Sequence, residues 1–142
     1  MKHRLETPEL SETTLLYGIS CHEKPHRLCW AINRELGLRM GRKEEDLEFL
    51  IAGSNGGEEK AHYTLFSYIA EEDHVTHSLI ENRSEKGPLI PQHPEVDHFF
   101  LIEAEEERED LDRMEELRAV GPILAVFPID PATLPSVADL LV

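Results

Sequence analysis

The residues best suited to acid–base or metal chemistry lie where a proline-bearing loop leads into an apolar segment. Pro88, Pro91 and Pro94 stiffen the loop, and residues 96–102 form the most apolar strand candidate in the chain. An aspartate beside a histidine can orient an imidazole or act as a general base, and such groups also bind divalent metals. The candidate ligand-binding residues at this junction are His93, Glu95, Asp97 and His98.

The alternation of side chains along a strand argues against a shared site for two of these residues. Successive strand residues point to opposite faces, so Asp97 and His98 converge only if the strand carries a bulge. The structural alternative is that Asp97 accepts hydrogen bonds from loop N–H groups and fixes the start of the strand, as aspartate often does at turns. We favour this structural role and keep the ligand-binding role as the alternative.

A second cluster gathers residue types that bind zinc. Cys21, His22, His26 and Cys29 fall within nine residues, but the spacing Cys-His-x3-His-x2-Cys is not a familiar zinc motif. If a helix begins near Pro25, His26 and Cys29 lie one turn apart on the same side. The alternative is that Cys29 acts as a small apolar core residue and Cys21 lies in a loop. A metal site formed by Cys21, His26 and Cys29 is the lesser expectation, and a nucleophilic Cys21 is weaker still.

Trp30 is the only tryptophan of the chain, and it lies off the apolar stripe of its helix. Arg27 and Arg34 are close to it in sequence, and exposed tryptophan and arginine are frequent anchors of protein interfaces. We favour the packing of Trp30 against a second apolar surface and keep the interface role as the alternative. For that alternative, Trp30, Arg27 and Arg34 are the candidate partner-binding residues.

Punctuation by proline and glycine defines the element that carries these residues. Pro25 suits the first position of a helix, and Gly37 suits the left-handed residue that ends one. Between them Leu28, Ile32 and Leu36 form an apolar stripe at helical spacing.

Hydrophobic patterns predict the remaining elements. A first strand is expected at 13–20, and the charged stretch 39–46 is expected to be a solvated turn. Helix 105–118 is strongly acidic, which suits a solvated face or, alternatively, a basic partner, and a final helix is expected to run through Leu141. Further strands are predicted at 47–52, 60–70, 75–82, 96–102 and 123–129.

This order of elements predicts an α+β fold. The short turns of the central part demand antiparallel pairs, while the unit 96–129 reads as a right-handed β-α-β crossover. We expect residues 1–11 to form a flexible N-terminal arm. Residues 12–142 should form one α+β domain with a mixed, mostly antiparallel sheet and two to three helices, of ferredoxin-like or related type.

Composition narrows the classes of function. The 142 residues include 29 acidic and 14 basic side chains, giving a formal net charge of −15. Such a charge repels phosphate backbones and anionic headgroups, so it disfavours nucleic acid and membrane partners. Two cysteines do not make a disulfide framework, and no apolar run is long enough to span a bilayer. These features predict a cytoplasmic protein, and no motif calls for a cofactor.

The junction described first resembles the motif of the IPExxxVDY family of small bacterial proteins. Ile90, Pro91, Val96 and Asp97 agree with that motif, whereas Gln92 and His98 replace its glutamate and tyrosine. The resemblance extends over about residues 15–104. It implies a bacterial cytoplasmic protein and transfers no catalytic residue, because the family is functionally uncharacterised.

Two functions follow as expectations. The first is a non-catalytic protein-interaction module, acting on a protein partner or as a homo-oligomer, because no specific catalytic motif is found. The second is a small-molecule or metal-binding protein that uses the entrance where the Pro-rich loop leads into the strand, or the Cys21/Cys29 turn. An enzyme would need at least two acid–base groups converging in one pocket, which spacing alone does not show.

Overall fold

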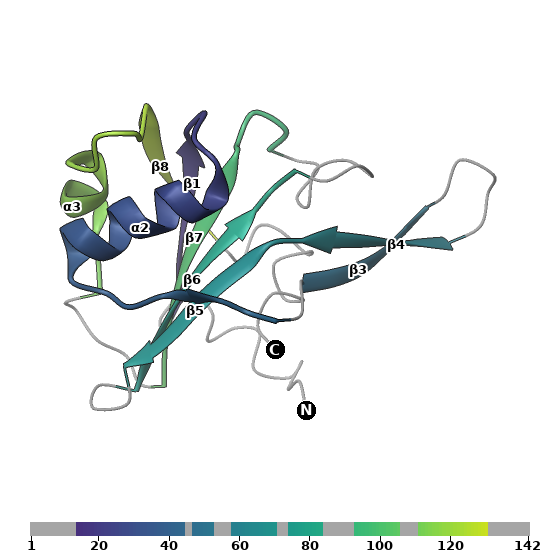
Figure 1. The fold of residues 1–142 in the computed structure, drawn as a ribbon, viewed down its shortest axis with the longest axis horizontal. Helices are drawn as coiled ribbons and strands as arrows, with labels where there is room; N and C mark the ends of the chain where they lie inside the picture. Colours follow the sequence, from purple (N-terminus) through teal and green to yellow (C-terminus); the bar gives the residue numbers. More distant parts are fainter. Residues whose placement is uncertain are drawn as a thin grey trace.

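In the part of the chain that the structure describes, two helices lie over one face of an antiparallel sheet (Figure 1). The computed structural model describes residues 14–44, 47–52, 58–70, 74–83, 93–105 and 111–130. The elements in chain order are β1 (Thr14–Ser20), α2 (Pro25–Leu36), β2 (Gly41–Arg42), β3 (Leu47–Ala52), β4 (Glu58–Tyr63), β5 (Leu65–Ala70), β6 (Val75–Glu81), β7 (His98–Ala104), α3 (Met114–Arg118) and β8 (Ala125–Ile129).

The main sheet has the strand order β2-β5-β6-β7-β1-β8, and β3 and β4 form a separate hairpin that extends away from it (Figure 1). Within the main sheet, β1, α2, β6, β7, α3 and β8 follow one another as β-α-β-β-α-β, with the strands in the order β8-β1-β7-β6. This is the ferredoxin-like arrangement. The predicted α+β fold is therefore confirmed.

The expectation of a mixed sheet needs correction. Every strand pair in the described sheet is antiparallel. The crossover β7-α3-β8 does join two parallel strands, but β1 lies between them and pairs with both. Strands β7 and β8 therefore run parallel but are not hydrogen-bonded to each other.

Helix α2 begins and ends where the sequence predicts. Pro25 occupies its first turn, and Gly37 has a φ of +70° and donates from its N–H to the carbonyl of Asn33. That left-handed conformation is one that glycine adopts without a steric cost. The buried residues Leu28, Ile32 and Leu36 turn the apolar stripe toward the sheet, as expected.

Three element boundaries differ from prediction. Residues 60–70 do not form one strand, because Thr64 interrupts it and separates β4 from β5. The charged stretch 39–46 contains the edge strand β2, whose preceding residues Leu38 and Met40 are buried. The last strand, predicted at 123–129, starts later, at Ala125, and ends at Ile129; the Pro128 within it is tolerated because β8 is at the edge of the sheet.

The second predicted helix is much shorter than 105–118. In the described part of that stretch only Met114–Arg118 is helical, and residues 111–113 are not. A hydrogen bond explains this local structure: the Tyr17 hydroxyl donates to Asp112 Oδ1 at 2.6 Å and accepts from the Arg113 N–H at 2.9 Å. Burial, followed by the bond to Asp112, raises the pKa of Tyr17 far above its usual value. This partly buried link between β1 and the residues just before α3 could not be predicted from spacing.

Several predicted segments lie outside the described residues. They are the N-terminal arm 1–11, the motif residues Ile90, Pro91 and Gln92, and the final helix through Leu141. No helix in the part of the chain that the structure describes is long and apolar enough to cross a membrane.

Side chains on both faces of the sheet are buried. Beneath the helices lie Ile19, Phe100 and Ile102, whereas alternation places Leu16 and Phe99 on the opposite face, where they are also buried. The central strands β1 and β7 are therefore apolar on both sides. This burial explains why 96–102 is the most apolar stretch of the sequence.

Gly18 on β1 is expected to tolerate no side chain. A Cβ there would lie 2.7 Å from the Phe127 ring, 3.0 Å from Val96 and 3.1 Å from Ile129. Overpacking of this kind costs about 2 kcal/mol. Denaturant unfolding should show that loss for Gly18→Ala but not for Gly41→Ala, where a Cβ meets nothing within 4 Å. Equal stabilities of the two variants would contradict the packing at Gly18.

Candidate functional site

Asp97 fixes the start of β7 to the end of β1. Its Oδ2 accepts a hydrogen bond from the backbone N–H of Cys21 at 2.9 Å, and its Oδ1 accepts one from Arg83 Nε at 2.9 Å. Its own N–H donates to the Ile19 carbonyl at 3.0 Å. Both carboxylate oxygens are thus engaged within the protein, in the structural role that the sequence favours.

Asn82 completes this junction and was missed by the sequence analysis. Its Nδ2 donates to the carbonyls of His93 at 3.0 Å and Val96 at 2.7 Å. Its backbone N–H donates to the backbone carbonyl of Asp97 at 3.0 Å. The side chain is fully buried. A lone asparagine after a strand carries no sequence signal for such a role, because its partners are backbone atoms from a distant segment.

The four candidate ligand-binding residues do not converge. His98 turns inward and is 3% exposed, while Asp97 points to the junction with Cys21. His93 Nδ1 lies 3.3 Å from Glu95 Oε1, and this pair is separate and partly exposed. Burial lowers the pKa of His98, which keeps its ring neutral and unsuited to binding an anion.

Replacing Asp97 with alanine is expected to cost about 2 kcal/mol of unfolding free energy, because the buried Cys21 N–H loses its acceptor. The matched control is Glu95→Ala, which removes a carboxylate two residues away that is largely exposed. Chemical denaturation measures both. A similar small effect from the two variants would show that Asp97 does not hold the junction.

The two cysteines have separate structural positions. Cys29 Sγ lies 3.7 Å from the Met40 carbonyl and 3.7 Å from Asn33 Nδ2, whereas Cys21 Sγ accepts from the Glu23 N–H at 3.4 Å. Burial raises the pKa of Cys29 to about 11 and also raises that of Cys21, so both thiols are protonated at neutral pH. A low-pKa nucleophile is therefore not supported.

The predicted metal ligands are not brought together. Cys21 and Cys29 are buried, whereas His26 is exposed on the outer side of α2. Among the described residues no group of three or more histidine, cysteine or carboxylate side chains is placed to hold a metal ion.

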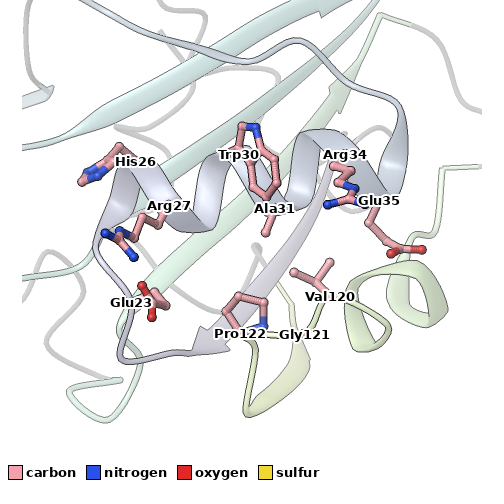
Figure 2. Close-up of a pocket in the computed structure, with 10 residues that line it drawn as sticks. All are labelled: Glu23, His26, Arg27, Trp30, Ala31, Arg34, Glu35, Val120, Gly121 and Pro122. Carbon is pink, nitrogen blue, oxygen red and sulfur yellow. The ribbon is translucent and has the colours of Figure 1, made fainter.

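A groove of about 780 Å³ runs beside α2 (Figure 2). One wall is the exposed side of α2, and the other is the turn that follows α3. The lining residues are Glu23, His26, Arg27, Trp30, Ala31, Arg34, Glu35, Val120, Gly121 and Pro122.

All three predicted partner-binding residues line this groove. Trp30 is 63% exposed, so it does not pack in the core, and the Arg34 guanidinium lies 5.4 Å from the centre of its ring. That distance is typical of a cation–π contact. Arg27 lies one turn before Trp30, and neither arginine forms an ion pair with a described residue.

A hydrogen-bonded clamp holds α2 rigidly under the groove. The Asn33 side chain accepts from the Met40 N–H at 2.9 Å and donates to the Met40 carbonyl at 3.0 Å, in the manner of a strand neighbour. This clamp ties the end of the helix to the segment that leads into β2. The outer side of α2 is therefore a fixed surface.

The opposite wall of the groove was not predicted. Val120, Gly121 and Pro122 follow α3, and the sequence indicated only that no helix continues past them. They reach α2 because the β7-α3-β8 crossover places α3 beside it.

No protein-family model and no curated protein matches the chain.

Two ionisable groups, one buried and one half-buried, lie away from the groove. His77 on β6 is 6% exposed, with its ring centre 6.0 Å from that of Phe100, and within the described residues its Nδ1 has no hydrogen-bond partner. Glu103 on β7 is half-buried between Thr14 and Thr76 in register. Burial moves both groups toward their neutral forms, lowering the pKa of His77 to about 4 and raising that of Glu103 to about 7.

Proposed function

We propose that this chain is a non-catalytic module that acts by binding another protein molecule at the groove beside α2. The observation that carries the proposal is Trp30, which remains 63% exposed next to two arginines and a groove. An exposed indole costs free energy in water, and it is the side chain most enriched among interface hot spots.

The walls of the groove suit a protein partner. Ala31, Val120 and Pro122 form an apolar strip that can bury an inserted side chain, while Arg27 and Arg34 border it with groups able to bond carboxylates and carbonyls (Figure 2). An apolar centre with a polar rim is the usual anatomy of an interface. The clamp at Asn33 supports the proposal, because a rigid surface loses little entropy on binding.

The remaining candidate groups favour a structural assignment over catalysis. Asp97 is engaged by Cys21 and Arg83, and both thiols have raised pKa values. We further propose that the protein belongs to the bacterial cytoplasm, as the resemblance to the IPExxxVDY family implies and as two free cysteines allow.

Affinity capture with a groove variant tests the proposal. The tagged wild-type chain should recover a partner from the native host in near-stoichiometric amounts. The control variant Lys43→Glu, which changes an exposed charge after the end of α2, should recover the same partner in the same amounts. Trp30→Ala should lose at least about 90% of that recovery, as expected for a hot spot. Equal recovery by Trp30→Ala, or no partner together with a monomeric wild-type chain, would overturn the proposal.

A further inference from the structure

We infer that the partner seated on the α2 groove is a second copy of this chain, whose own α2 runs antiparallel to the first. The inference rests on the proposed function and specifies its partner. It is carried by the order of charges along the exposed side of α2, which is complementary to itself when reversed.

The charges are placed symmetrically about one small residue. Arg27 precedes Ala31 by four residues and Glu35 follows it by four, so the three share one row along the helix. In a pair related by a two-fold axis at Ala31, Arg27 of each copy faces Glu35 of the other. Each charge pair therefore occurs twice, and the small side chain of Ala31, which is partly buried against the core, adds no bulk at the centre of the row.

The exposed aromatic residue also fits this geometry. Trp30 is next to Ala31 in sequence and lies on one flank of the row that Arg27, Ala31 and Glu35 form. A two-fold axis perpendicular to the helices places Trp30 of both copies on the same flank of the helix pair. The two indoles then lie next to each other near the axis. The Arg34 guanidinium already lies 5.4 Å from the ring centre of Trp30 in its own chain. In the antiparallel pair its distance along the helix axis from Trp30 of the other copy is less than one helical turn.

Charge balance favours a self-complementary occupant over the other partners. The groove carries two arginines and two glutamates, so with His26 neutral its formal charge is zero, on a chain with a net charge of −15. A basic partner would be drawn to the acidic remainder of the surface rather than to the groove. An acidic segment would meet Glu23 and Glu35 at the two ends. A second copy meets neither obstacle.

Charge reversal provides a sharp test, because residues eight apart on one helix do not contact each other within a chain. Sedimentation equilibrium at about 0.15 M salt, where the Debye length is about 8 Å, measures self-association against the 16.2 kDa monomer. One helix and one turn make a small interface, so a dissociation constant on the order of 10 µM is expected for the wild type.

The variants have distinct expected results. Arg27→Glu and Glu35→Arg should each weaken association at least about tenfold, because two attractive pairs become repulsive. Mixing the two single variants should restore association to within about threefold of wild type, as should the double variant Arg27→Glu with Glu35→Arg. Trp30→Ala should weaken it at least about thirtyfold. Lys43→Glu is the control for Arg27→Glu, because it lowers the net charge by the same two units at an exposed residue that does not line the groove.

Each other outcome overturns the inference. A monomeric wild-type chain, a dimer that both single variants leave intact, or a mixture that fails to associate would each do so. If the wild type is monomeric yet captures a different protein that Trp30→Ala loses, the inference fails while the proposed function stands. If neither self-association nor capture occurs, both fail.

Discussion

Replacing Glu103 with glutamine is expected to stabilise the folded protein at pH 8 by up to about 3 kcal/mol. Burial raises the pKa of this carboxyl to about 7 from an ordinary 4.5. Between these two values the folded state binds a proton that the unfolded state has released, so stability falls as pH rises through the interval. Glutamine has nearly the same shape and carries no charge, so the penalty disappears.

The pH dependence distinguishes this mechanism from a general packing effect. At pH 4.5 the carboxyl is largely protonated in the folded state, so the wild type and Glu103→Gln should unfold with nearly equal free energies. The matched control is Glu105→Gln, which neutralises an exposed carboxylate two residues along. A variant no more stable than wild type at pH 8 would show that Glu103 has a charge partner in the folded protein.

Acid should destabilise the protein through His77, with the opposite sign. Burial, followed by the nearby Arg113 charge, lowers the pKa of this imidazole to about 4 from 6.5. As pH falls from 6.5 to 4 the unfolded state gains a proton that the folded state refuses. The contribution of His77 to the unfolding free energy should therefore drop by about 3 kcal/mol over that interval.

The variant His77→Phe isolates this contribution, because a phenyl ring can pack beside Phe100 without titrating. The quantity to compare is the change in unfolding free energy between pH 7 and pH 4, measured with urea at each pH. Wild type should lose about 3 kcal/mol more than the variant. The matched control is His22→Gln, which removes an exposed histidine. If His77→Phe keeps the wild-type pH dependence, another buried group, such as His98, is responsible.

Local signals made α2 the most accurately predicted element. Pro25 and Gly37 constrain the backbone by their own chemistry, so the boundaries of the helix do not depend on tertiary contacts. The helix predicted for 105–118 lacked such signals at its start. There the tertiary bond between Tyr17 and Asp112 prevails, and the described helix begins only at Met114.

The candidate site was predictable in one half. Trp30, Arg27 and Arg34 lie on a single helix, so helical spacing was enough to group them. The wall formed by Val120 and Pro122 comes from a segment about 90 residues away and depends on the crossover past β1. Asn82 was missed because its partners are the backbone carbonyls of His93 and Val96, which lie 11 and 14 residues later in the sequence.

The position of β1 in the sheet also has a consequence for folding kinetics. Both of its hydrogen-bonded neighbours, β7 and β8, come late in the sequence. A ribosome adding about 5–20 residues per second needs roughly 4–16 s to proceed from the end of β1 to the start of β7, about 80 residues later. During that time β1 has no partner strand, and the apolar side chains on both of its faces are not yet covered by the sheet and helices. The chain therefore completes its sheet only after most of it has been synthesised, and refolding should be slower than for a helical protein of this size.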